Sequence, residues 1–219
     1  MESLADTIKE VRAYTRAHPE LLRAHHFLYD LPLRPTRLSA RFVVIGVNPG
    51  EQKGDWEVWP EPTEETSLFD FRAELGSRPP ASLRWRDLTK KFCQTDEVVM
   101  TEFFPWSSAN LGQDFLGKFG TRFKNSPHLG FCVEITDRLV NHYRPEAVVC
   151  SGLGAAKVLS SPLGLTHVGS LKVDGHRLVE TFERDGVSWH FTKHWSGSFG
   201  FSTAQRDAII TYMHARGDS

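Results

Sequence analysis

The stretch Arg41-Phe42-Val43-Val44-Ile45-Gly46-Val47-Asn48-Pro49-Gly50-Glu51 decides the fold of this chain. Its first half is a short run of apolar, β-branched residues, which is typical of a strand covered on both faces. Its second half is a loop of glycine, proline and one uncharged polar residue, Asn48. Open α/β sheets bind ligands past the carboxyl ends of their strands, and glycine there lets the backbone approach a ligand closely. We therefore expect the functional site to begin at this loop.

The same order of strand, loop and helix recurs along the chain. Further strands are predicted within residues 97–104 and at 147–151 and 189–192, and helices begin near Leu4, Pro19, Leu83, Phe131 and Thr203. Asp174-Gly175, between two apolar runs, predicts a β-hairpin. The pattern predicts an α/β fold in which helices wrap a parallel sheet.

Composition limits the size and partners of the protein. With 219 residues, 40% hydrophobic content and 24% charge, we expect one domain over 1–219, with residues 1–40 as a helical segment packed on it. The formal net charge of −1 gives no field over the whole molecule that favours nucleic acid, so a DNA-binding surface must be a local basic face. The expected state is a monomer.

Cysteine usage and hydropathy bear on the location of the protein. Cys93, Cys132 and Cys150 are odd in number and far apart, which predicts buried thiols rather than a disulfide framework, zinc ribbon or iron–sulfur cluster. No basic segment followed by an apolar one opens the sequence, and no apolar run has the length to span a bilayer. We expect a cytoplasmic, nucleoid-associated protein without membrane contact.

Three segments together resemble the uracil-DNA glycosylase superfamily. They are GVNPG at 46–50, PEAVVCSGLGAAKVL at 145–159 and HWSGS at 194–198, each at the carboxyl end of a predicted strand. The resemblance implies a three-layer α/β/α sandwich around a central, mostly parallel four-stranded sheet. It also implies that the protein flips a base out of DNA and hydrolyses the bond between base and deoxyribose.

The resemblance assigns roles to the loop residues. Asn48 falls on the residue that positions the attacking water, as in the mismatch-specific and single-strand-selective branches. His194 would donate a hydrogen bond to the carbonyl of the leaving base, in a motif that usually reads His-Pro-Ser and here reads His194-Trp195-Ser196. Base-binding positions would be Gly46, Val47, Pro49, Gly50 and Ser196. The reaction would be monofunctional hydrolysis without metal or other cofactor.

Two departures from the family bear on which base is removed. Strict uracil enzymes place a tyrosine where this chain has Gly50, so the barrier to a 5-substituted pyrimidine is absent. A Thr-Asn pair that reads uracil in related enzymes aligns here with Thr101-Glu102. An ionised carboxylate only accepts hydrogen bonds, so Glu102 would suit an exocyclic amine such as that of a modified cytosine.

Aromatic and basic residues supply the remaining candidates. Phe69 or Phe71 would stack on the flipped base, and Phe199 or Phe201, beside Ser198, would fill the space that the base leaves. Lys118, Arg122 and Lys124 would contact phosphates. Core packing for the first two phenylalanines, and solvated helix faces for the basic residues, are the structural alternatives.

Each central residue also has an alternative interpretation. Asn48 can be a turn former, His194 an ordinary loop histidine and Glu102 an ion-paired residue. The expected function is a DNA glycosylase acting on a uracil-like or modified pyrimidine, in single- or double-stranded DNA that carries a damaged or modified base. The alternative is a catalytically weak protein of the same fold that binds nucleic acid or a free nucleobase.

Overall fold

The computed structural model describes residues 4–24, 40–48, 81–106, 108, 111–195 and 202–215. The chain forms two compact units, each assembled from separated segments. The first unit comprises Met1–Pro32, Val47–Arg84 and Thr101–His142, and the second comprises Leu33–Gly46, Trp85–Met100 and Tyr143–Ser219. The predicted α/β class is confirmed, because helices separate β1, β2, β3 and β4 along the chain and all the described strands belong to one sheet.

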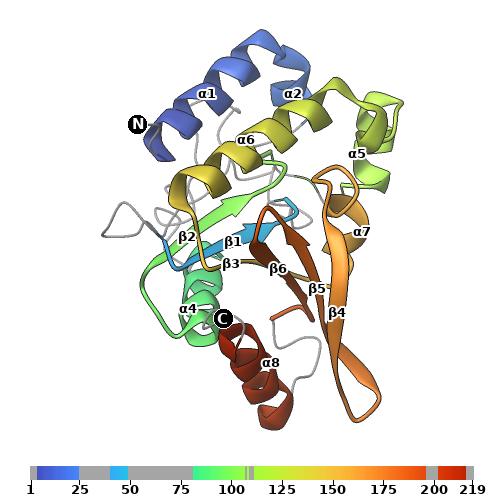
Figure 1. Ribbon diagram of the computed structural model, residues 1–219. Helices are drawn as coiled ribbons and strands as arrows, with labels where there is room; N and C mark the ends of the chain where they lie inside the picture. Colours follow the sequence, from blue (N-terminus) through green and yellow to red (C-terminus); the bar gives the residue numbers. More distant parts are fainter. Residues whose placement is uncertain are drawn as a thin grey trace. The chain divides into compact units, whose positions relative to one another are not determined.

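Within the described residues, the sheet has six strands in the order β2-β1-β3-β6-β5-β4 (Figure 1). The strands are β1 (Phe42–Gly46), β2 (Val98–Glu102), β3 (Ala147–Ser151), β4 (Thr166–Val173), β5 (His176–Arg184) and β6 (Val187–Thr192). β3 runs parallel to both β1 and β6, whereas β5 runs antiparallel to β6 and β4. In the described part of the chain the sheet is therefore mixed and six-stranded, where the resemblance implied four strands in a mostly parallel arrangement.

Two Asp-Gly turns account for the additional strands. Asp174 and Gly175 join β4 to β5 with φ values of 50° and 74°, and Asp185 and Gly186 join β5 to β6 with 53° and 78°. Left-handed backbone at both central residues is what a tight type I′ hairpin turn requires, and Asp-Gly adopts it readily. The first turn confirms the predicted hairpin, while the second extends the antiparallel part to three strands.

The core of the second unit explains why these runs form strands. All five residues of β3 are buried, and so are the first four of β1, as their apolar sequences predict. Phe42 and Val44, two positions apart on one sheet face, share a hydrophobic cluster with Phe92 of α4 (Ala81–Cys93). Ile209 and Met213 of α8 (Thr203–Ala215) join the same cluster. Burial of such side chains contributes about 1.5–3 kcal/mol each to stability.

Helices and aromatic side chains build the first unit. Its helical elements are α1 (Leu4–Ala17), α2 (Pro19–Ala24), α5 (Gln113–Phe119), the 3₁₀ turn η2 (Phe123–Asn125) and α6 (Pro127–Tyr143), whose last residue belongs to the second unit. α1 lies along α6 in Figure 1, and Tyr14 stacks on Phe131 with ring centroids 3.7 Å apart. Glu10 and Arg138 form an ion pair between the same helices.

Several further predictions are confirmed. The predicted helices at Leu4, Pro19 and Thr203 form, and the segment of small residues after β3 is the short helix α7 (Ala155–Leu159). The three cysteines are buried and free, and burial raises the pKa of each thiol. Within the described residues, every helix is too short or too polar to cross a membrane.

Candidate functional site

The three segments of the resemblance extend past the carboxyl ends of strands that all end at one edge of the sheet. The parallel register pairs Ile45 with Cys150, and Ser151 with Thr192, at the carboxyl ends of β1, β3 and β6. Because parallel strands run in the same direction, their carboxyl ends meet at the same edge. Gly46, Gly152 and Lys193 are therefore the points at which the three segments leave this edge.

Beyond β3 and β6, two loops of the second unit lie against each other. The Gly152 N–H donates a hydrogen bond to the Thr192 carbonyl oxygen at 2.8 Å. A Cβ atom on Gly152 would lie 3.8 Å from Cδ2 of His194, and the φ of Gly152 is +116°, a conformation that favours glycine. The backbone of Gly152 thus lies directly beside the His194 ring.

His194 is half-buried, and its ring is neutral at physiological pH. Burial lowers the pKa of His194. A neutral imidazole donates a hydrogen bond from one ring nitrogen and accepts at the other. His194 can therefore act as an uncharged hydrogen-bond donor to a carbonyl oxygen.

Trp195, which replaces the proline of the family motif, is a core residue. Its indole is buried and stacks on Phe92, with ring centroids 4.6 Å apart and an interplanar angle of 4°. Its backbone N–H donates a hydrogen bond to Oγ of Ser151 at 3.2 Å. Both the indole and the backbone N–H of Trp195 therefore hold the loop that carries His194 to the rest of the second unit.

Asn48, in the first unit, is held by a chain of polar contacts. Its Nδ2 donates a hydrogen bond to the Ser108 carbonyl oxygen at 2.6 Å, and Ser108 Oγ donates one to Asp114 Oδ2 at 2.7 Å. Lys118 pairs with the same Asp114 oxygen at 3.0 Å. The side-chain oxygen of Asn48 is a hydrogen-bond acceptor, the kind of group that can orient a water molecule.

The loop after β1 is also tied to the segment after β2. The N–H of Phe104 donates a hydrogen bond to the carbonyl oxygen of Val47 at 2.9 Å. Val47 precedes Asn48, and Phe104 lies two residues after Glu102. The first unit thus brings together the two segments to which the sequence assigned the water-positioning residue and the base-reading residue.

Glu102 differs from its predicted state. Its Oε2 is buried and has no hydrogen-bond partner among the described residues, and burial raises the pKa of the carboxyl group to about 8. The interpretations of Glu102 as an ionised acceptor and as an ion-paired residue both assumed a charged group. At pH 7 most molecules carry the neutral acid, which donates one hydrogen bond through O–H and accepts at its carbonyl oxygen.

The predicted phosphate contacts fall on the first unit. Lys118 lies in α5 and pairs with Asp114, so part of its charge is already balanced. Arg122 precedes η2 and Lys124 lies within it, and both are exposed. Several other predicted residues lie outside the described part of the chain: Pro49, Gly50, Phe69, Phe71, Ser196, Ser198, Phe199 and Phe201.

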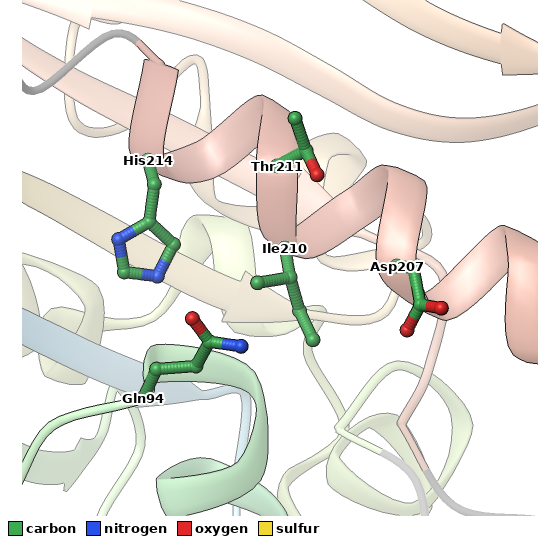
Figure 2. Close-up of a pocket in the computed structure, with 5 residues that line it drawn as sticks. All are labelled: Gln94, Asp207, Ile210, Thr211 and His214. Atoms are coloured by element: carbon green, nitrogen blue, oxygen red, sulfur yellow. The ribbon is translucent and has the colours of Figure 1, made fainter.

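The second unit also carries an open hollow beside α8. It has a volume of about 240 Å³, and its lining residues are Gln94, Asp207, Ile210, Thr211 and His214. Figure 2 shows the Gln94 amide below the His214 ring, with Asp207 further along the helix. None of these residues belongs to the three segments, so the hollow has no part in the predicted chemistry.

The sequence interpretation missed the residues that hold the site residues in place. Ser108 and Asp114 orient Asn48 from a distance of 60 or more positions along the chain, for which the sequence carries no periodic signal. Ser151 lies within the second segment of the resemblance, but its contact with the Trp195 backbone follows only from the register of β3 and β6.

No model of a known protein family matches this chain, and no curated protein matches it closely enough to indicate a relationship. The resemblance to the uracil-DNA glycosylase superfamily depends on the three quoted segments. What it implies about function is a proposal.

Proposed function

We propose that this protein is a monofunctional DNA glycosylase that hydrolyses the N-glycosidic bond of a flipped uracil-like or modified pyrimidine base. The observation that carries this proposal is that the three matching segments extend past the carboxyl ends of three neighbouring parallel strands, β1, β3 and β6, at one edge of the sheet. Ligand sites of open α/β sheets lie at that edge. We further propose that β2-β1-β3-β6 is the superfamily's four-stranded sheet, and that β4 and β5 are an addition to it.

The proposed reaction divides the chemistry between two side chains. The oxygen of Asn48 orients a water molecule, whose oxygen bonds to C1′ of the sugar while the bond between C1′ and the base nitrogen breaks. The base leaves with the electron pair of that bond, and the water proton passes to solvent, because an amide cannot take up a full proton. The His194 N–H hydrogen-bonds the base carbonyl that gains negative charge. Such a preorganised donor contributes about 10²–10³ in rate.

Glu102 supports a pyrimidine substrate. The edge of uracil offers N3–H and O4, and the edge of cytosine offers N3 and an amine. A neutral carboxyl group has one donor and one acceptor, so it can complement either edge, whereas a carboxylate complements neither fully. The proposed substrate class therefore covers 5-substituted uracils as well as modified cytosines, since Gly50 lacks the side chain that excludes a 5-substituent in strict uracil enzymes.

The proposed partner is DNA in which the target base is already loosely held. Flipping costs a few kcal/mol of stacking and pairing, so damaged, mismatched or single-stranded sites are favoured. The exposed Arg122 and Lys124 are available for phosphate contacts. The first and third matching segments contain no lysine, and Lys157 of the second is an exposed residue of α7. We therefore propose a reaction that stops at hydrolysis.

The experiment that tests the proposal measures base release. Oligonucleotides that carry uracil, mismatched thymine, hypoxanthine or 5-substituted cytosines, in single and double strands, are incubated with the protein, and released bases are identified by mass spectrometry. We expect the wild type to release a pyrimidine. Asn48→Ala should lose this activity, and Asn141→Ala, a matched control at an exposed position of α6, should keep it. If the protein binds these DNAs, releases no base and keeps its affinity in Asn48→Ala, the proposal is wrong and a binding protein is the better description.

A further inference from the structure

A group of metal-ligand side chains lies in the first unit, at the junction of three helices. His18 follows α1, Glu20 lies in the first turn of α2, and His128 lies in the first turn of α6. His18 Nδ1 is 3.1 Å from Glu20 Oε1, and His128 Nε2 is 3.8 Å from the same oxygen. The three atoms lie within 4.8 Å of one another. None of these residues takes part in the proposed base removal.

The spacing of these atoms fits a single transition-metal ion. Zinc binds imidazole nitrogen and carboxylate oxygen at about 2.0–2.2 Å, so neighbouring ligand atoms of a tetrahedral site lie about 3.4 Å apart. The two N···O separations, 3.1 and 3.8 Å, lie on either side of this value, and the two ring nitrogens lie within 4.8 Å of each other. The half-buried side chains of His18 and Glu20 have room for the rotations that would bring all three ligand atoms around one ion.

A second layer of contacts fixes the ring of His128. The hydroxyl oxygen of Tyr14 lies 3.0 Å from His128 Nδ1. When Nδ1 carries the proton and donates it to this oxygen, the lone pair of the ring lies on Nε2, which faces Glu20. Metal-bound histidines usually have such a partner on the other ring nitrogen. Tyr14 also packs on the His18 ring, with centroids 4.2 Å apart.

The surroundings of His128 favour binding of a cation. The side chain is almost fully buried, and the rings of Phe115, Phe119 and Trp106 surround it. A metal-binding imidazole must be neutral, and burial of a histidine ring disfavours its charged form. A carboxylate beside a neutral buried imidazole leaves negative charge that a cation would balance.

We propose that His18 Nδ1, Glu20 Oε1 and His128 Nε2 bind one divalent transition-metal ion, with Zn²⁺ as the first candidate. Two imidazoles and one carboxylate suit zinc and its neighbours in the first transition row, whereas Mg²⁺ and Ca²⁺ require more oxygen ligands. The ion fastens the junction of α1 and α2 to the start of α6, which lies more than 100 positions further along the chain. Its role is to stabilise the first unit.

The test is a zinc titration of the full chain after removal of metal with a chelator. We expect one Zn²⁺ per chain and a rise in Tm with added zinc, because an ion that binds only the folded state stabilises it. Co²⁺ should give the visible absorption of a four- or five-coordinate site. Mg²⁺ should change neither the Tm nor the absorption spectrum. Failure of the stripped protein to bind Zn²⁺ at one ion per chain would overturn the proposal.

Variants separate this site from adventitious binding by surface histidines. Glu20→Gln and His18→Ala change half-buried side chains, so both should fold and both should weaken zinc binding at least about tenfold. Tyr14→Phe should weaken it about 10- to 100-fold by removing the partner of His128 Nδ1. His176→Ala, at an exposed position of β5, is the control and should bind as the wild type does. Equal affinity of Glu20→Gln and the wild type for zinc would contradict the assignment.

Discussion

Trp195 and Phe92 stack face to face, with ring centroids 4.6 Å apart and planes inclined by 4°. Phe92 lies at the end of α4, and Trp195 lies in the loop after β6 that also carries His194. The stack holds this loop to the core of the second unit. Restoring the proline of the family motif would therefore remove an anchor of the loop.

Truncation of this anchor should destabilise the protein strongly. We expect Trp195→Ala to lower the free energy of unfolding by about 3–5 kcal/mol, since a large buried aromatic side chain is lost. Trp195→Pro should cost at least as much, because it also removes the N–H that donates to Ser151 Oγ. Urea unfolding measures both. Val168→Ala, at an exposed apolar position, is the control, with an expected change within about 0.5 kcal/mol.

Glu102 should make stability depend on pH. Burial raises its pKa to about 8 in the folded state, above the ordinary value of 4.5. Its proton-linked contribution is fully present below pH 4.5 and is lost as the pH rises to about 8, because the folded state then holds a proton that the unfolded chain has released. The slope is at most about 1.4 kcal/mol per pH unit.

Glu102→Gln should flatten this dependence. Urea unfolding of the variant at pH 5, 7 and 9 should show its largest gain over the wild type at pH 9, where the buried carboxyl group of the wild type is ionised. Glu134→Gln, at an exposed position of α6, is the control and should follow the wild type. A wild-type stability that rises from pH 5 to pH 9 to the same extent as that of the variant would show that Glu102 ionises normally.

The strands could be predicted from the sequence because their signal is local. The apolar runs at β1 and β3, and the Asp-Gly pair of the first hairpin turn, are enough to predict these elements from neighbouring residues alone. The number of strands in the sheet could not be predicted, because it depends on whether the β4–β5 hairpin pairs with β6. That pairing follows from the second turn at Asp185, a short signal that does not by itself show which strands it joins.

The state of the site residues could be predicted only in part. The sequence indicated Asn48, Glu102 and His194, because each lies where a strand ends. It could not show that Glu102 is neutral, since that depends on burial by distant residues. Nor could it show that His18 and Glu20 lie beside His128, because more than 100 positions separate them along the chain. Contacts of this range arise from tertiary packing and leave no periodic pattern.

A side chain at position 152 should destabilise the protein. Its φ of +116° is a conformation that residues with a Cβ rarely adopt, and the added carbon would lie beside the His194 ring. We expect Gly152→Ala to lower the free energy of unfolding by about 1–3 kcal/mol. Gly154→Ala is the matched control, because Gly154 has ordinary helical dihedral angles and open space around its Cα. It should leave stability unchanged or raise it by a few tenths to about 1 kcal/mol, as measured by urea unfolding.

His194 should contribute to catalysis more than to binding if the proposed function is right. Because burial lowers its pKa, the neutral ring is present at pH 7 and can donate to the base carbonyl. We expect His194→Ala to lower kcat for base release by about 10²–10³. The Kd for the same DNA should change little, since the donor acts mainly on charge that develops as the bond breaks. His167→Ala, an exposed histidine on β4, is the control for kcat and Kd. A His194→Ala variant with unchanged kcat but weakened DNA binding would assign this residue to recognition and remove it from the proposed mechanism.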